Sequence, residues 1–345
     1  MAHFLAPGVQ FNIHPHNELG DNDVFYFDQR RSQKMSPDFF AELLRDADTT
    51  DMRFHDLAEQ FYYDCKVRNL SPNTLRGYGE RLMNFYLFLK VRKIRLEGVN
   101  RAVIQDYIMS LKDRVSDHTV NGRLRVLRVF FRFLAREGLS SNGNPMDKVS
   151  LIKTENTLKP ILMPEQIEQL LSVPNKRIFT GYRNFAILLV FWDSLIRLSE
   201  LTNLKIADVD LKQGLLKVYG KGRKERVVPV GTKTVRALHL YWVKYRQRIP
   251  GELFFCQKSG RMLERRNVER ILTRIGERVK LHVTPHLIRH SAATWWIKQG
   301  AQPMYLQNLM GHTSMSVTQR YVHLASVDDL KKHHQKFSLA DSLRI

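Results

Sequence analysis

The sequence is poor in cysteine and has no long apolar run. Its 345 residues include only Cys65 and Cys256, which are too few and too far apart for a disulfide framework or a cysteine-based zinc site. No stretch approaches the roughly 20 consecutive apolar residues that a membrane-spanning helix needs. The start of the chain also lacks the basic segment and apolar block of an export signal. We therefore expect a cytoplasmic protein in a reducing compartment, with no membrane partner.

Acidic side chains are scarce relative to basic ones. Lys and Arg number 55 against 34 Asp and Glu, which gives a formal net charge of +21. Such an excess predicts an anionic partner rather than a particular fold, and nucleic acid is the leading candidate. The alternative is a protein whose basic face is merely solvated. The length is too great for one ordinary core and indicates two domains with some surplus chain.

The first part of the chain divides into an irregular extension and a helical domain. Residues 1–50 show little order, so a partly disordered extension and an arm that contacts DNA or a partner are both open. Residues 51–150 carry apolar positions at helical spacing and accommodate four helices. One helix is capped by Ser71-Pro72 and another begins near Ser116. Their inward positions are Leu75, Tyr78, Leu82, Phe85 and Leu89, and Val120, Leu124, Leu127, Phe131 and Leu134.

A basic stripe lies on another face of the second of these helices. Arg125, Arg128 and Arg132 follow one another at helical spacing. A solvated surface is the ordinary explanation of such a stripe. In a chain of this charge we favour contact with DNA phosphates.

The second half of the chain begins after a stretch with little periodicity. Residues 138–159 are rich in Ser, Asn, Gly and Pro and predict a linker. Residues 160–335 form the second domain, in which β-prone runs at 215–219 and 226–230 predict a hairpin. The other runs predict helices over 164–171, 183–204, 234–246, 267–279, 286–299, 303–310 and about 316–323. Residues 336–345 form a short tail.

Polar residues of the second domain have the chemistry to act together on a phosphodiester. Singly each is weak evidence, because a lone Tyr is usually core or surface and a lone Arg or Lys is usually a solvated charge. Arg197 lies among apolar neighbours at a helix junction, where a guanidinium needs an anion or Glu200 beside it. The set is Arg197, Lys221, His286, Arg289, His312 and Tyr321. The order and spacing of these six residues, rather than any one of them, are what make the set significant.

This ordered set resembles the tyrosine recombinase, or phage integrase, family, and its Xer-like bacterial and mobile-element members in particular. The family pattern has an Arg in a T-G-x-R-x-S-E-L box, a Lys in a G-K-G turn between two strands, and H-x-x-R at the start of a helix. L-G-H and a Tyr follow. The resemblance covers roughly residues 56–330, and every polar position is filled. Ser194-Leu195 stands where Thr-Gly is usual, which indicates a differently shaped turn before Arg197, and Met310 precedes the glycine before His312.

The resemblance implies a mainly α-helical, two-domain clamp on double-stranded DNA. Residues 51–150 would be the helical core-binding (SAM-like) domain, and residues 160–335 a mixed α+β catalytic domain with a small β-sheet. It implies a nucleoid-associated, site-specific recombinase for integration, excision or resolution of DNA. Exchange between two duplexes needs a cut in every strand, so we expect a homotetramer on DNA, with or without accessory proteins. The apolar tail residues Phe337, Leu339 and Leu343 are candidates for docking on a neighbouring protomer.

The residue types fit cleavage through a 3′-phosphotyrosyl intermediate. A phosphodiester gathers charge on its non-bridging oxygens in the transition state, and Arg197 and Arg289 provide planar, permanently charged clamps. Tyr321 is the expected nucleophile, because a phenol is also a competent leaving group and so conserves the bond for religation. Lys221 on the hairpin turn is the expected general acid for the departing 5′ oxygen.

The remaining assignments are supporting ones. His286 is placed to assist proton transfer from the tyrosine, and His312 to hydrogen-bond the phosphate. Glu200 is assigned an orienting role. Arg223 and Lys224, in the same hairpin turn, are candidate DNA contacts beside the helical stripe.

Other functions fit part of this pattern. A type IB topoisomerase uses similar groups to nick and reseal one duplex, and a DNA-binding protein can keep the fold without catalysis. The two histidines lack an acidic or histidine partner at metal-ligand spacing, so we expect no metal and no cofactor.

Overall fold

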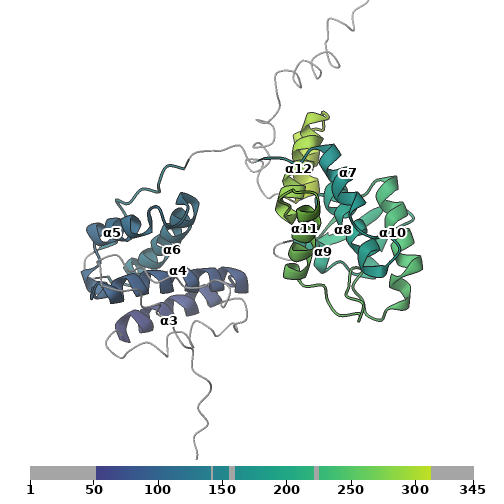
Figure 1. Ribbon diagram of the computed structural model, residues 1–345. Coiled ribbons are helices and arrows are strands. Elements are labelled where there is room, and N and C mark those ends of the chain that lie inside the picture. The colour runs from purple at the N-terminus through teal and green to yellow at the C-terminus, as the bar shows by residue number, and fades with distance from the viewer. Residues whose placement is uncertain (1–51, 141–142, 155–159, 221–224, 312–345) are drawn as a thin grey trace, which may run out of the picture. The chain divides into compact units, whose positions relative to one another are not determined.

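The computed structural model describes residues 52–140, 143–154, 160–220 and 225–311. The chain divides into two compact units, Met1–Thr157 and Leu158–Ile345 (Figure 1). The described residues are mainly α-helical with one small antiparallel sheet, which confirms the predicted fold class. Within these ranges no helix is both long and apolar enough to cross a membrane.

Local capping signals set the helix starts of the N-terminal unit. Ser71 accepts a hydrogen bond from the backbone N–H of Thr74 at 3.3 Å, and Pro72 occupies the first turn of the helix that follows. Ser116 accepts in the same way from Thr119 at 3.4 Å. The described elements are α3 (Met52–Val67), α4 (Pro72–Val91), the 3-10 turn η2 (Leu96–Gly98), α5 (Arg101–Leu111) and α6 (Asp117–Arg136).

The inward faces predicted for α4 and α6 form the core of this unit. Phe85, Leu89 and Leu124 are fully buried, whereas Tyr78 is only partly covered. Aromatic rings from α3, α4, α5 and α6 pack against one another in this core. Burial of this apolar surface is what holds the amphipathic helices together.

Residues 143–154 pack along α6 instead of starting a free linker. The Asn121 amide donates to the carbonyl of Ile152 and accepts from its backbone N–H, each at 2.8 Å. Arg128 donates to the carbonyl of Val149 at 2.6 Å, and Met146 is buried. The linker predicted over residues 138–159 is therefore shorter than its composition indicated.

The C-terminal unit is built around α8. Ala186, Ile187 and Phe191 of this helix are fully buried, and α8 packs against α10 and α12. The described helices are α7 (Pro164–Ser172), α8 (Phe179–Ser194), α9 (Leu198–Thr202), α10 (Thr232–Lys244), α11 (Arg265–Arg278), α12 (Pro285–Lys298) and α13 (Pro303–Met310), with 3-10 turns η3 (Ile206–Asp208) and η5 (Arg246–Arg248).

The predicted hairpin is present as part of a three-stranded sheet. The strands are β1 (Val209–Asp210), β2 (Leu215–Tyr219) and β3 (Glu225–Pro229), in the order β1-β2-β3 and all antiparallel. Leu215 pairs with Pro229, and Tyr219 pairs with Glu225, so residues 220–224 connect β2 to β3.

The single helix predicted over residues 183–204 is interrupted just before Arg197. α8 ends at Ser194, Leu195 adopts left-handed φ and ψ angles of 55° and 22°, and α9 begins at Leu198. This conformation is uncommon for leucine, but the side chain is fully buried and packing holds it. Leucine thus takes the backbone conformation that glycine adopts most easily.

Candidate active site

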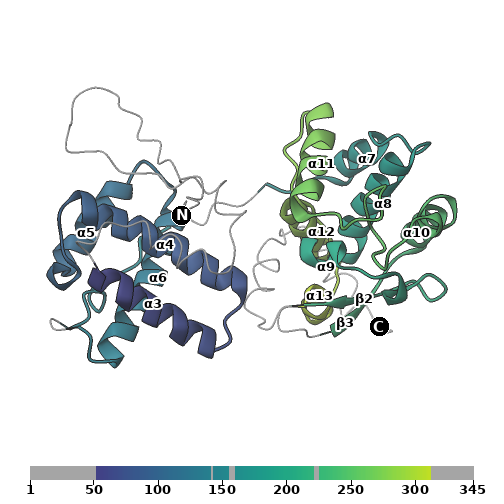
Figure 2. The ribbon, with the colours of Figure 1, turned by 90° about the horizontal axis from the view of Figure 1, so that it is seen from below.

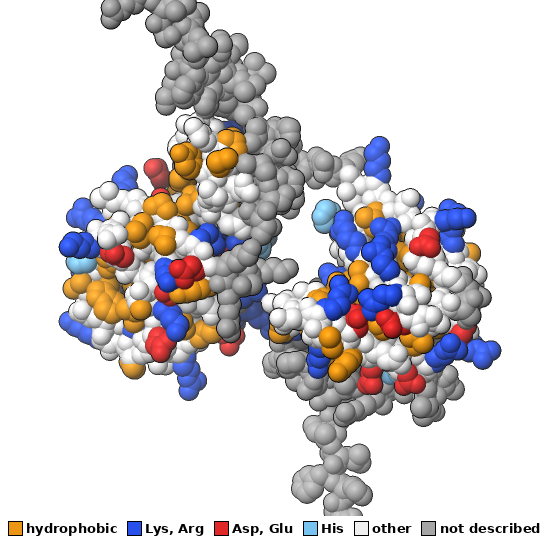
Figure 3. All heavy atoms as spheres, turned by 180° about the vertical axis from the view of Figure 1, so that it is seen from behind, with side chains coloured by type: hydrophobic (Ala, Val, Ile, Leu, Met, Phe, Trp, Pro, Cys, Tyr) orange, Lys and Arg blue, Asp and Glu red, His pale blue; other side chains and the backbone are white. Residues whose placement is uncertain are grey.

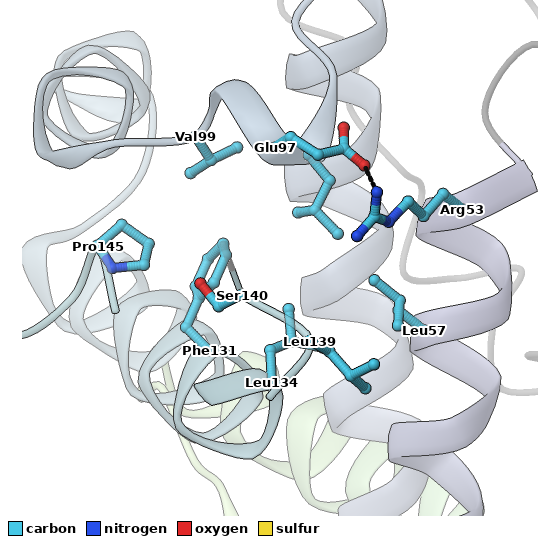
Figure 4. A pocket seen from close by; sticks show the side chains of 10 residues that line it. Arg53, Leu57, Glu97, Val99, Phe131, Leu134, Leu139, Ser140 and Pro145 are labelled. Atoms are coloured by element: carbon cyan, nitrogen blue, oxygen red, sulfur yellow. Dashed lines mark ion pairs between the residues drawn. The ribbon is translucent and has the colours of Figure 1, made fainter. Parts of the chain in front are cut away.

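The N-terminal unit has a small hollow that lacks catalytic groups. Figure 4 shows it between the starts of α3 and η2 and the end of α6, with apolar walls that include Leu57, Val99 and Phe131. Its charged groups are Arg53 and Glu97, which pair with each other at 2.9 Å. The paired charges and apolar walls of this hollow offer no group that would activate a nucleophile.

Arg197 follows the left-handed turn and is held by Glu200. The Glu200 carboxylate accepts from the backbone N–H of Arg197 at 2.7 Å and from its Nη1 at 2.9 Å. The Arg197 side chain keeps 33% of its surface exposed, whereas the Glu200 side chain keeps 1%. The guanidinium is therefore fixed on one side and accessible on the other, which leaves it able to bind an anion.

Glu200 is a buried carboxylate that stays ionised. It contacts a second arginine, Arg226 of β3, whose Nη1 and Nη2 donate at 2.7 and 2.8 Å. Burial alone would raise the pKa of Glu200, but hydrogen bonds from Arg226 and from the Arg197 backbone hold it below its usual value.

Arg289 and His286 lie in the first turns of α12. Thr284 caps this helix by accepting from the backbone N–H of Leu287 at 3.1 Å, and Pro285 occupies its first position. Arg289 points inward with 6% of its surface exposed, whereas His286 is exposed one turn earlier.

Three arginines converge on the C-terminal end of α13. Arg226 Nε donates to the carbonyl of Leu309 at 3.0 Å, and Arg197 Nη2 donates to that of Gly311 at 2.9 Å. Arg289 Nη2 donates to the carbonyl between them, that of Met310, at 2.8 Å. Helix ends leave carbonyls without intrahelical partners and carry partial negative charge, which suits guanidinium groups.

This convergence brings together the two predicted catalytic arginines. Arg289 also donates to the carbonyl of Leu195, in the turn before Arg197. Figure 2 shows α9, α12, α13 and the β2–β3 pair gathered in one part of the C-terminal unit. Both arginines are therefore anchored at the backbone that leads directly into His312.

Gly311 gives a test of this arrangement. Its φ is 61°, and a β-carbon there would lie 2.9 Å from Arg226 Nη1 and 3.1 Å from Arg226 Cζ. We expect Gly311→Ala to destabilise the unit by about 2–3 kcal/mol, from backbone strain plus displacement of Arg226.

Gly138→Ala is the control, because Gly138 has a φ of 69° and nothing near its added β-carbon. Denaturant unfolding should give a loss near 1 kcal/mol there. Equal losses in the two variants would show that Arg226 does not crowd the site.

Several predicted site residues lie outside the described ranges. These are Lys221, Arg223, Lys224, His312 and Tyr321. The described backbone reaches Gly220 and resumes at Glu225, and it ends at Gly311.

The three arginines of the predicted basic stripe on α6 differ in how far their side chains are exposed. Arg125 and Arg132 are exposed, whereas Arg128 is partly buried and bound to the carbonyl of Val149. Figure 3 shows Lys and Arg side chains gathered on one face of the N-terminal unit. Arg128 thus has a structural contact in addition to its predicted one.

Sequence reasoning missed two features. Arg226 was seen only as part of a strand, although it binds both Glu200 and the end of α13. The exposed residues Arg266, Arg270 and Arg274 recur every fourth position on α11 and form a second basic face. The spacing on α11 could have been read from the sequence. Among the described residues no group of three His, Cys, Asp or Glu side chains is placed to hold a metal ion.

Family models match both units of the chain. Residues 160–327 match the model described as "Phage integrase family", and residues 58–138 match "Phage integrase, N-terminal SAM-like domain". Tyrosine recombinase XerC of Pelobacter propionicus is 34% identical over 274 residues, covering 78% of this chain and 90% of that protein. Tyrosine recombinase XerC of Thermodesulfovibrio yellowstonii is 36% identical, covering 74% of this chain and 86% of that protein.

A solved structure shares the fold. The XerH site-specific recombinase, bound to palindromic difH substrate in a post-cleavage complex, superposes with a TM-score of 0.65 at 18% identity, covering 88% of this chain and 94% of that one. The chain belongs to the tyrosine recombinase, or phage integrase, family of site-specific DNA recombinases, as its motifs predicted. The matches favour neither the topoisomerase nor the non-catalytic alternative.

Proposed function

We propose that this chain cuts and rejoins DNA at a specific site through a covalent bond between Tyr321 and a backbone phosphate. The observation that supports this best is the anchoring of Arg197 at the carbonyl of Gly311 and of Arg289 at that of Met310, directly before His312. Fixed guanidiniums stabilise the charge that develops on the phosphate oxygens and need no reorganisation during the reaction.

The proposed reaction conserves the energy of the broken bond. The phenolic oxygen of Tyr321 attacks phosphorus, the bond to the 5′ oxygen breaks, and a 3′-phosphotyrosyl link forms. Lys221 gives its proton to the departing 5′ oxygen. His286 assists removal of the phenolic proton, and His312 hydrogen-bonds a phosphate oxygen. Attack by a 5′ hydroxyl of the partner strand reverses these steps and completes the exchange.

DNA binding is assigned to both units. Residues 51–150 act as the core-binding domain and residues 160–335 as the catalytic domain. Phosphate contacts supply most of the affinity and make it sensitive to salt, while base contacts set the site. The proposed phosphate contacts are Arg125, Arg128, Arg132, Arg223 and Lys224, with Arg266, Arg270 and Arg274 of α11 added from the structure.

Assembly on DNA follows from the chemistry. Each protomer supplies one tyrosine, and exchange of two duplexes requires every strand to be cut, so four protomers act together. Residues 336–345 supply the apolar side chains that dock on a neighbouring protomer. The protein works in the cytoplasm on nucleoid DNA.

A plasmid assay tests the proposed function. The substrate is a supercoiled plasmid with two copies of the DNA that adjoins the protein's own gene, and the control plasmid carries neither copy. In EDTA we expect exchange products from the first plasmid and unchanged supercoiling of the control. Relaxation of both plasmids to the same degree, or binding without any strand exchange, would reject the proposal.

A further inference from the structure

Arg226 forms hydrogen bonds to two segments near the predicted catalytic groups: α9, through Glu200, and the C-terminal end of α13. It donates to both oxygens of Glu200 at 2.7 and 2.8 Å, and to the carbonyl of Leu309 at 3.0 Å. We propose that Arg226 is a positioning residue for DNA cleavage: it locks Glu200, and through Glu200 the guanidinium of Arg197, against the β2–β3 hairpin and the end of α13. This inference rests on the function proposed above.

The contact between Arg226 and Glu200 differs from an ordinary surface ion pair. The side chains keep only 15% and 1% of their surface exposed. The two parallel hydrogen bonds match the planar fork of a guanidinium, which lysine cannot reproduce. Exposed pairs contribute little because water and salt screen them, whereas a buried pair is costly to break. Arg226 is thus a fixed part of the site.

Glu200 transmits this constraint to Arg197. Its Oε1 accepts from both Arg226 Nη1 and Arg197 Nη1, and its Oε2 accepts from Arg226 Nη2 and the Arg197 backbone. Without Arg226 the buried carboxylate would lose two hydrogen bonds and a positive charge. It would then turn toward Arg197 or take up a proton, and either change moves the Arg197 guanidinium.

Arg226 also sets the position of the hairpin. A second bond holds the end of β3, where the Gly231 N–H donates to the Asp193 carboxylate of α8 at 2.7 Å. The hairpin is therefore tied near Arg226 and near Gly231, and Lys221 lies in the connection that begins beyond Tyr219. Loss of the Arg226 hydrogen bonds would leave the end of the hairpin that leads to Lys221 less firmly held.

The test compares Arg226→Met and Arg226→Lys with Glu225→Gln. Glu225 is the neighbouring residue on β3, and it pairs with Lys217 at 2.9 Å on an exposed surface. The measurement is the rate of covalent attachment to nicked duplexes from DNA adjoining the gene, at saturating DNA and below each variant's unfolding temperature. We expect about a 100-fold loss for Arg226→Met and about tenfold for Arg226→Lys, because small displacements of positioned groups cost this much. Glu225→Gln should stay within about twofold of the wild type.

A pH profile separates positioning from mere structural support. Among the residues that the structure describes, the charged groups that face Glu200 are Arg226 from β3 and Arg197 from its own turn. Removing Arg226 removes a cause that lowers the pKa of Glu200, so the acid limb of the rate should move to higher pH. In a Glu200→Gln background, Arg226→Met should cause no such movement and little further loss of rate. A purely structural role would reduce the folded fraction and leave the acid limb where it is.

Three results would overturn the inference. These are a normal rate per folded molecule in Arg226→Met, an unmoved acid limb, or independent, additive effects of the Arg226 and Glu200 substitutions. Failure of the proposed function looks different: wild type and Glu225→Gln would then form no adduct, and both proposals would be rejected together.

Discussion

Replacing Arg289 with methionine should lower the rate of covalent attachment to DNA about a thousandfold, because the proposed mechanism places its preorganised charge at the reacting phosphate. Arg289 is 6% exposed, so methionine fills a similar volume without creating a large cavity. The same change removes the bonds to the carbonyls of Leu195 and Met310. Loss of these bonds loosens the turn before Arg197 and the end of α13 together.

Arg183→Met is the matched control for this variant. Arg183 is also buried, at 5% exposure, and donates to the carbonyl of Cys256 at 2.9 Å, but within the described part of the chain it makes no hydrogen bond to the end of α13. Unfolding in denaturant should show losses of roughly 2–4 kcal/mol for both variants. The rate per folded molecule should fall only in Arg289→Met. If both variants slow cleavage equally, Arg289 has no special part in the reaction.

Three helix starts were predictable because their causes are local. Ser71, Ser116 and Thr284 each accept a hydrogen bond from a backbone N–H three residues later. Such contacts depend on neighbouring residues alone, so the sequence contains the information directly. The hairpin followed in the same way from two β-prone runs around a short connection.

Arg226 was missed because its partners are remote in the chain. Glu200 lies 26 residues away and Leu309 lies 83 residues away. A basic residue on a short strand gives no local sign of a buried carboxylate partner, and only the folded unit brings the two together. The same holds for Asn121, whose bonds to Ile152 span 31 residues and shorten the predicted linker.

The turn at Leu195 shows a different limit of sequence reasoning. Leucine disfavours the left-handed region, so the helix predicted over residues 183–204 gave no sign of a break at this residue. Complete burial of the side chain in the core of the C-terminal unit offsets that preference. Packing energy from distant parts of the chain decided the local backbone.

Substituting Tyr321 with phenylalanine should abolish covalent attachment completely while leaving DNA affinity within about twofold, because only the hydroxyl that we propose as the nucleophile is removed. Tyr305→Phe is the control, since Tyr305 is 63% exposed on α13 and makes no bond with the converging arginines that the structure describes. That variant should form adduct at the wild-type rate.

The most direct measurement uses a duplex from DNA adjoining the gene, nicked close to the cleavage point. A short fragment then leaves after cleavage, so the covalent adduct accumulates. Wild type and Tyr305→Phe should give a protein–DNA adduct in EDTA that survives denaturation, and peptide mapping should place the DNA on Tyr321. An adduct from Tyr321→Phe, or attachment at any other residue, would contradict the account.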